Sequence, residues 1–192
     1  NMHRAPHLLP EMIQEEVDRV SEWAEQIVLG YGLCSNGIVG VRAPRQGLII
    51  TRAHDCVALL LGSLQEYKRL SRAQPGTYYL TQGWIQEGKD PLTMMELEYL
   101  PKLGRETAEW GAREELRHYT DFLLIHTGAG DKDYLREKAR ANADFFGKSW
   151  REVQGDPGYL ERVLYGPYDG RHFLLLSAGE SIQQRWFLWA QD

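Results

Sequence analysis

The sequence predicts an α/β fold, namely a three-layer α/β/α sandwich with a mostly parallel sheet. Short apolar runs alternate along the chain with longer amphipathic segments. Continuous apolar runs are typical of parallel strands buried on both faces, and their alternation with helices is typical of βα units. The length of 192 residues suits a single domain. We therefore expect one domain over residues 1–192, and we leave open whether it consists of two pseudo-repeated βα halves that divide near residue 90 or 120.

The first part of the chain is expected to contain two helices and three strands. Residues 9–24 carry apolar side chains at helical spacing, namely Leu9, Met12, Ile13, Val17, Val20 and Trp23. This stripe should face the core. The next segments predict a strand at 27–31, a strand at 48–51, a helix at 59–70 and, after a Pro-Gly turn, a strand at 77–81.

The second part of the chain continues the alternation of helices and strands. Residues 94–119 are broadly helical, and Pro101 and Gly104 are expected to split them. The remaining expected elements are a strand at 122–126, a helix at 132–146, a strand at 150–153, a helix after Asp156-Pro157 and a strand at 172–176. The tail at 180–192 contains Trp186, Phe187 and Trp189, and we expect it to pack back onto the domain.

Composition and charge argue against several classes of protein. The net charge is −5 and the basic residues are scattered, whereas nucleic-acid binding requires a basic face. No apolar run approaches the roughly 20 residues that span a bilayer, so we expect no membrane segment. The only cysteines are Cys34 and Cys56, which cannot form a disulfide framework and fit a reducing compartment such as the cytoplasm.

Reactive side chains follow two of the predicted strands. Cys34 comes shortly after the strand at 27–31, and His54 and Cys56 come directly after the strand at 48–51. Ligands in open α/β sheets bind beyond the carboxyl ends of the strands, so both cysteines fall on the rim where a site is expected. Thiolate and imidazole groups suit zinc or iron. The sequence therefore predicts a metal or cofactor site at Cys34, His54 and Cys56.

Further residues on the same rim extend this candidate site. His126 ends the strand at 122–126, and His3 could likewise end an earlier strand, so either is a candidate for a further ligand. Arg52 could anchor a carboxylate or a phosphate, and Asp55 could orient an imidazole or act as a general base. We include Arg52 and Asp55 in the candidate pocket.

Each of these residues also has a simpler explanation. Both cysteines could be small buried hydrophobic residues, or one of them could be a redox-active or nucleophilic thiol. Asp55 could cap the helix that follows it, and Arg52 could form a structural ion pair. His126 could be a histidine whose hydrogen bonds are satisfied at the end of a strand. These alternatives stay open at the level of sequence.

Aromatic residues surround the turn before residue 77. Tyr78, Tyr79 and Trp84 could form the wall of a pocket for a flat ligand, since aromatic side chains dominate small-molecule sites. They could equally be packed in the domain core. The sequence does not decide between these two explanations.

A series of motifs resembles the family known as domain of unknown function 1638. These are Tyr31-Gly32-Leu33-Cys34, Arg52-Ala53-His54-Asp55-Cys56, Leu61-Gly62-Ser63, and the segment from Pro75 to Trp84. The opening His3-Arg4-Ala5-Pro6 and the ending from Phe173 to Ile182 are also similar, so the resemblance covers most of the chain.

The resemblance implies an association but no established activity. Genes of this family often lie beside those of corrinoid-dependent methyltransferases and corrinoid proteins. Family members usually carry a further strand and helix, often with another cysteine, before the His-x-x-Pro segment. The sequence given starts close to that segment, so the resemblance implies a site that is either incomplete or uses His3.

These observations together predict a metal- or cofactor-binding accessory protein of corrinoid-linked one-carbon metabolism. We expect a zinc or iron ion, and through the resemblance a corrinoid, as the cofactor, with a corrinoid protein or a methyltransferase as the partner. Two alternatives remain open: a thiol- or metal-dependent enzyme of the methyltransferase type, and a non-catalytic partner of a corrinoid protein. The sequence does not name the metal, the substrate, the reaction or the oligomeric state.

Overall fold

The structure is a computed structural model that describes residues 6–187. Contacts between Cα atoms divide the chain into two compact units. Unit 1 runs up to Tyr67 and resumes at Asp156, whereas unit 2 is the continuous segment Lys68–Gly155. The expectation of a single domain stays a prediction.

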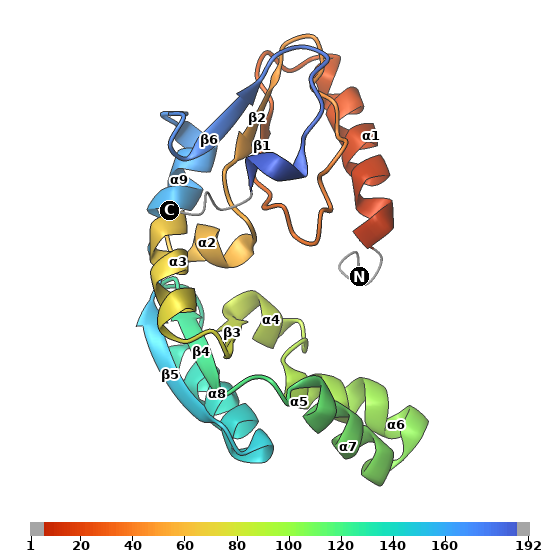
Figure 1. The fold of residues 1–192 in the computed structure, drawn as a ribbon, viewed down its shortest axis with the longest axis vertical. Coiled ribbons are helices and arrows are strands. Elements are labelled where there is room, and N and C mark those ends of the chain that lie inside the picture. Colours follow the sequence, from red (N-terminus) through yellow and green to blue (C-terminus); the bar gives the residue numbers. More distant parts are fainter. Residues whose placement is uncertain (1–5, 188–192) are drawn as a thin grey trace. The chain divides into compact units, whose positions relative to one another are not determined.

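Unit 1 contains one mixed sheet of three strands (Figure 1). Its elements are η2 (Pro6–Leu8), α1 (Leu9–Ser21), β1 (Val28–Leu29), β2 (Leu48–Thr51), α2 (Cys56–Leu60), the start of α3 (Leu64–Ala73), α9 (Gly158–Tyr165), β6 (Phe173–Leu176) and η4 (Gln184–Trp186). The strand order is β1-β2-β6. β1 pairs with β2 in parallel, with Val28 opposite Ile49, and β6 pairs with β2 in antiparallel fashion, with Leu48 opposite Leu176.

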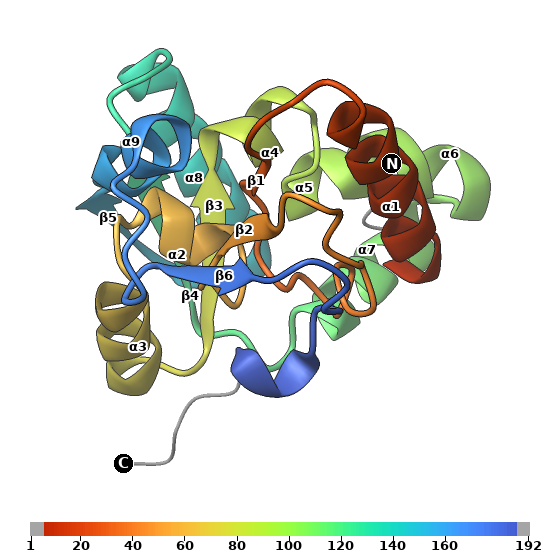
Figure 2. The same ribbon diagram turned by 90° about the horizontal axis from the view of Figure 1, so that it is seen from above.

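The sheet of unit 1 is covered on both faces, and every residue of its central strand β2 is buried. Leu48 and Ile50 face a core that includes Val17 of α1, and Ile49 faces a second core with residues of α2 and α9. Figure 2 shows α1 on one side of β2 and α2 with α9 on the other. Unit 1 therefore has the three layers that the sequence predicts.

Unit 2 contains one fully parallel sheet in the order β3-β4-β5. Its elements are β3 (Thr77–Thr81), α4 (Gln82–Gln86), α5 (Pro91–Met94), the π-helical turn η3 (Met95–Tyr99), α6 (Leu100–Leu103), α7 (Arg105–Glu115), β4 (Asp121–His126), α8 (Lys132–Phe146) and β5 (Ser149–Gln154). Every residue of the central strand β4 is buried. Phe122 and Leu124 pack against α7 and α8 in the core of this unit.

The prediction of an α/β fold with mostly parallel strands is confirmed, and the differences lie in details. The strands form two sheets rather than one. The expected helix at 59–70 is two helices, because Gly62 has a φ of +81° that ends α2 before α3 begins. Pro101 does not split its helix: η3 precedes it, and a widened turn accommodates the missing N–H of a proline. The break comes at Gly104, where φ is +74°.

No helix in the described part of the chain is both long enough and apolar enough to cross a bilayer.

Candidate functional site

The turn that carries Cys34 has an uncommon backbone. Cys34, Ser35 and Asn36 have φ values of 40°, 56° and 66°, so three consecutive residues other than glycine lie in the left-handed region. Each such residue costs about 1–2 kcal/mol relative to a right-handed conformation. A backbone of this kind persists only where the surrounding structure holds it, and such residues cluster at functional sites.

Hydrogen bonds and close packing hold this turn in place. The N–H groups of Leu33 and Cys34 donate to the carbonyls of Ala53 and His54, at 2.9 and 3.0 Å, and so extend the contact between β1 and β2. A Cβ atom on Gly32 would lie 2.8 Å from the Asp55 backbone. Glycine is therefore required at position 32, where the turn passes directly against the segment that carries Cys56.

Asp55 positions Cys56 at the start of α2. Its carboxylate accepts hydrogen bonds from the N–H groups of Val57 and Ala58, at 3.0 and 3.3 Å, which makes it the N-cap of that helix. This contact confirms the simpler of the two explanations for Asp55. Cys56 is then the first residue of the helix, and it is exposed.

The two cysteines lie together in unit 1. The backbone N–H of Cys56 and that of Gly32 interact with the Cys34 sulfur, and the two thiols also interact electrostatically. Burial raises the pKa of the Cys34 thiol to about 11, and the charge of a Cys56 thiolate adds to this increase. The pKa of Cys56 is also raised, mainly because nearby protein atoms desolvate its sulfur although the residue as a whole is exposed, and further by the Asp55 carboxylate. Both cysteines are thus protonated thiols at neutral pH.

Tyr31 belongs to the same cluster. Burial raises the pKa of its hydroxyl, and the neighbouring Cys34 and Cys56 add to the increase in that order. The Tyr31 carbonyl accepts a hydrogen bond of 2.6 Å from the Thr51 hydroxyl, which ties the end of β2 to this turn. Sequence reasoning noticed Tyr31 only as part of a motif and missed its proximity to the thiols.

His54 and Arg52 lie on either side of the buried Ala53 at the end of β2. The Nδ1 atom of His54 is 3.8 Å from an Asp55 carboxylate oxygen, and the proximity of that carboxylate raises the histidine pKa. The Arg52 Nη1 atom donates to the Gly170 carbonyl at 3.1 Å, and the Arg52 backbone N–H donates to the backbone carbonyl of His172 at 2.7 Å. Arg52 therefore connects β2 to the loop before β6.

A complete ligand set for a metal is not formed by these side chains. Within residues 6–187, no three His, Cys, Asp or Glu side chains lie close enough to hold a metal ion. The structure brings Cys34 and Cys56 together and places His54 beside Asp55 in the same unit. His3 lies outside the described residues. The predicted metal site stays a prediction.

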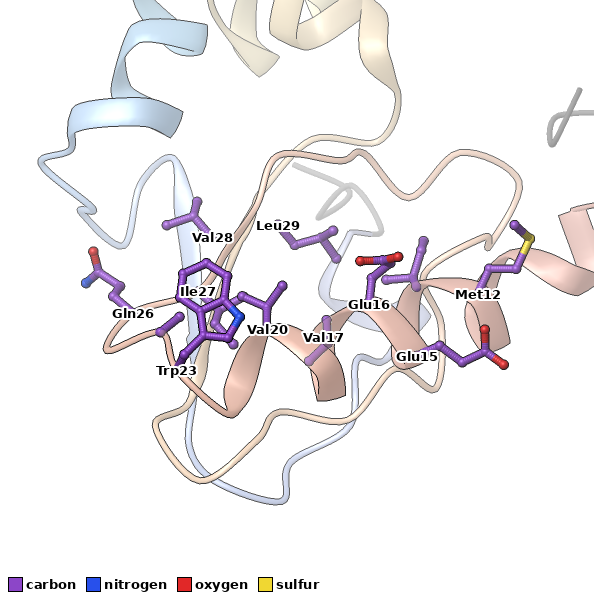
Figure 3. A pocket seen from close by; sticks show the side chains of 12 residues that line it. Met12, Glu15, Glu16, Val17, Val20, Trp23, Gln26, Ile27, Val28 and Leu29 are labelled. Atoms are coloured by element: carbon purple, nitrogen blue, oxygen red, sulfur yellow. The ribbon is translucent and has the colours of Figure 1, made fainter.

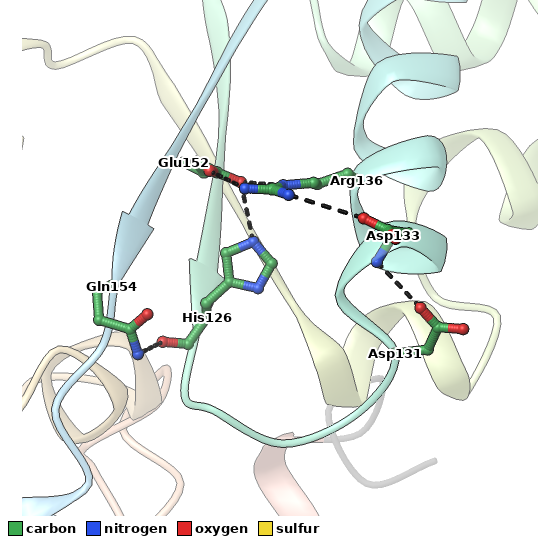
Figure 4. Close-up of polar contacts among 6 residues, drawn as sticks. All are labelled: His126, Asp131, Asp133, Arg136, Glu152 and Gln154. Carbon is green, nitrogen blue, oxygen red and sulfur yellow. Dashed lines mark hydrogen bonds and ion pairs between the residues drawn. The ribbon is translucent and has the colours of Figure 1, made fainter.

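His126 lies in unit 2, at the carboxyl end of β4, and its surroundings are different (Figure 4). The ring is buried, and its Nε2 atom is 3.0 Å from a Glu152 carboxylate oxygen. Arg136 donates to both oxygens of the same carboxylate, at 2.8 and 2.6 Å. These bonds from Arg136 lower the pKa of Glu152 to about 2, against the opposing effect of burial and with help from His126.

This cluster satisfies the hydrogen-bonding groups of Glu152 within unit 2. Sequence reasoning missed Glu152 and Arg136. Their opposite charges are the signal that the sequence offers, with Arg136 on α8 and Glu152 on the neighbouring strand β5. Gln154 Nε2 also donates to the His126 carbonyl at 3.0 Å. His126 is therefore a strand-end histidine with a partner, as its simpler explanation states.

The three aromatic residues of the predicted wall also lie in unit 2. Tyr78 packs in its core, with its ring centroid 5.1 Å from Tyr119 and 5.5 Å from Phe122, and burial raises its pKa to about 12. Tyr79 is the next residue of β3, and Trp84 lies in α4; both are half-buried. The pocket that would join them to Cys34 stays a prediction.

Comparisons with known proteins identify the family. A family model described as a protein of unknown function (DUF1638) matches residues 1–164, so the chain belongs to this family. No curated protein and no solved structure is significantly similar to the chain.

Proposed function

We propose that this member of the DUF1638 family binds a metal ion, free or within a cofactor such as a corrinoid, through the thiols of Cys34 and Cys56. In this proposal it is an accessory protein of corrinoid-linked methyl transfer and docks with a corrinoid protein or a methyltransferase. The family resemblance implies neighbouring genes for corrinoid proteins and corrinoid-dependent methyltransferases, and this association supports this part of the proposal. The metal is zinc or iron, since both accept thiolate ligands.

The observation that carries the proposal is the meeting of the two cysteines. They are 22 positions apart in the sequence, and the parallel pair of β1 and β2 brings the second against the first. A strained turn holds one and a capped helix holds the other. A chain that used them only as small hydrophobic residues would not need backbone strain to place Cys34, nor would it leave Cys56 exposed.

The electrostatics favour a metal ligand over a free nucleophile. An active thiol needs a lowered pKa, whereas burial raises the pKa of both thiols here, and repulsion adds to the increase, from a Cys56 thiolate at Cys34 and from the Asp55 carboxylate at Cys56. A bound cation would remove that repulsion, because metals bind cysteine as thiolate. His54 is exposed and adjacent, and in this proposal it turns to the metal as the third ligand. An open coordination position would then remain for a thiol or a corrinoid.

The cytoplasm is the compartment that fits this site. Two neighbouring thiols that are needed as metal ligands must stay reduced, and the cytoplasm keeps them so. We place the protein there as part of the proposal.

Metal analysis of anaerobically purified protein tests the proposal. The protein is incubated with Zn²⁺ or Fe²⁺, separated from free metal and analysed for bound metal. We expect close to one equivalent in the wild type, almost none in Cys34→Ser or Cys56→Ser, and at least about tenfold weaker binding in His54→Ala. His118→Ala is the matched control, because His118 is an exposed histidine of unit 2, and it should bind like the wild type. Wild-type protein that retains no metal would contradict the proposal.

A further inference from the structure

The apolar stripe of α1 is only partly buried. The sequence pattern predicts that all its members face the core, yet Leu9 and Val17 are its only buried residues among those of the helix itself. Met12 is 43% exposed, and Trp23, just after the helix, is 72% exposed. These side chains continue the stripe that packs against the sheet, so they form an apolar surface that the described residues leave exposed.

A groove lies beside this surface, within unit 1. Its volume is about 610 Å³, and its walls are the face of α1 from Met12 to Val20 and the segment after the helix from Trp23 to Leu29 (Figure 3). Val20 and Trp23 face Val28 across it in Figure 3. This size is in the range of about 300–1,000 Å³ in which proteins bind drug-sized molecules or a few side chains.

The floor of the groove includes the edge strand of the sheet. β1 pairs only with β2 among the described strands. The Ile27 carbonyl accepts from the Ile49 N–H at 3.0 Å, so Ile27 and Leu29 direct their backbone groups towards β2. In a parallel pair the residue between them directs its N–H and carbonyl the other way. Val28 therefore presents a backbone donor and an acceptor along the groove.

The negative charge of α1 indicates the kind of partner that the groove would bind. The helix contains Glu11, Glu15, Glu16 and Asp18 but only one basic residue, Arg19. Glu15 and Glu16 line the groove, and Arg19 bonds to Glu16 at 3.0 Å, which leaves Glu15 as an exposed carboxylate on the rim. A second copy of this surface would bring acidic helices together and is disfavoured for that reason. A basic partner is complementary.

We propose that this groove binds an extended segment of a partner protein, which adds to the edge of β1 as a further strand. Its apolar side chains lie on Met12, Val20 and Trp23, and a lysine or arginine lies opposite Glu15. Main-chain hydrogen bonds to Val28 fix its position, as in other cases of strand addition. The segment alternates apolar and basic residues, because successive side chains of a strand point to opposite faces. This site is separate from the two cysteines in its residues and in its ligand.

Peptide binding tests the proposal. The probe is a synthetic ten-residue peptide of alternating valine and lysine, and the comparison peptides replace every lysine by glutamate or one central valine by proline. We expect the lysine peptide to change the emission of Trp23, with no such change in Trp23→Phe. The proline peptide should bind much more weakly, because proline cannot donate in a sheet.

Hydrogen exchange separates strand addition from simple adhesion. The peptide should slow exchange of the Val28 amide by at least about tenfold, whereas a peptide on the surface of α1 alone would leave it unchanged. Glu15→Lys should weaken binding at least about threefold at low salt, and Glu22→Lys, which makes the same change of charge outside the groove, should not. Equal binding of the glutamate peptide, unchanged exchange at Val28, or no binding at all would overturn the proposal.

Discussion

The two units place reactive side chains at equivalent positions but use them differently. Cys34 and Cys56 follow the parallel strands β1 and β2 of unit 1, and His126 ends the parallel strand β4 of unit 2. In unit 2, His126 and Arg136 both bond to the Glu152 carboxylate. In unit 1, the Cys34 sulfur interacts with the backbone N–H groups of Gly32 and Cys56, and the Cys56 thiol, Tyr31 and Asp55 lie near it. The carboxyl ends of the strands show where a site can form. Side chains that do not already bond to one another show which of two such positions can accept a ligand.

The backbone of unit 1 is also more strained than that of unit 2 at these positions. The loop after β4 takes its positive φ values at Gly128 and Gly130, where they cost little. The turn after β1 takes them at Cys34, Ser35 and Asn36, and they are costly at the first two of these. Unit 1 therefore accepts strain at its rim and unit 2 avoids it.

The largest expected effect comes from glycine substitution in these two turns. Gly32→Ala would bring a Cβ within 2.8 Å of the Asp55 backbone, so it should destabilise unit 1 by about 1–3 kcal/mol and separate Cys34 from Cys56. Gly128→Ala meets no atom within 4 Å, and its cost should be about 1 kcal/mol, from the φ of +87° alone. Urea unfolding and the alkylation rate of Cys34 measure the two effects. Equal losses of stability and no change in alkylation would remove the distinction between the turns.

The next effect concerns the ion pair of unit 2 and depends on pH. The folded pKa of Glu152 is about 2, below the value of about 4.3 in an unfolded chain. Its contribution to stability is therefore complete above pH 4.3 and is lost as the pH falls towards 2. Glu152→Gln should lower stability at pH 7 by about 1 kcal/mol, a modest amount because the pair is partly exposed to solvent.

Urea unfolding between pH 7 and pH 2 measures this dependence. The difference between wild type and Glu152→Gln should shrink below pH 4.3. Glu137→Gln, an exposed neighbour on α8, should differ from the wild type by less than about 0.5 kcal/mol throughout. A constant difference for Glu152→Gln would show that its charge does not matter.

The smallest effect compares two aspartates with the same structural role. Asp55 caps α2 and Asp131 caps α8, each with two backbone N–H donors. Replacing either by alanine should cost about 1 kcal/mol. Only Asp55→Ala should also lower the pKa of Cys56 and speed its alkylation at pH 8, because the Asp55 carboxylate raises that pKa.

Alkylation is measured in a Cys34→Ser background, so that Cys56 is the only thiol. Asp131→Ala in the same background serves as the control and should leave the rate unchanged. A rate that is unaffected by Asp55→Ala would mean that burial alone sets the reactivity of Cys56.

Much of the fold could be predicted because burial leaves a direct pattern in the sequence. The apolar runs at β2 and β4 and the long helix α8 are found where the sequence predicts them. The break at Gly62 was missed, because a single glycine within a helical pattern is often tolerated. Two halves were left open with a division near residue 90 or 120, whereas the units divide after Tyr67 and after Gly155, since an apolar run does not name the strand with which it pairs.

The candidate site could be predicted in part. Cys34 and Cys56 meet because each follows one strand of a parallel neighbouring pair, and the sequence predicts both of these strands. The left-handed turn could not be predicted, because no glycine occupies positions 34–36 and only Asn36 tolerates that conformation well. The groove was missed because periodicity assigns Trp23 to a stripe but does not show whether anything covers it.

The division of unit 1 into two stretches of sequence has a consequence for its biosynthesis. Unit 2 is continuous, so all its strands are available once the ribosome has released residue 155. The sheet of unit 1 lacks β6 until residues 173–176 emerge. Domains fold as units during translation, so unit 2, which begins later in the sequence but ends earlier, should finish folding before unit 1. Until then Cys34 and Cys56 belong to an unfinished sheet in the nascent chain, and their thiols are open to any oxidant or metal present during synthesis.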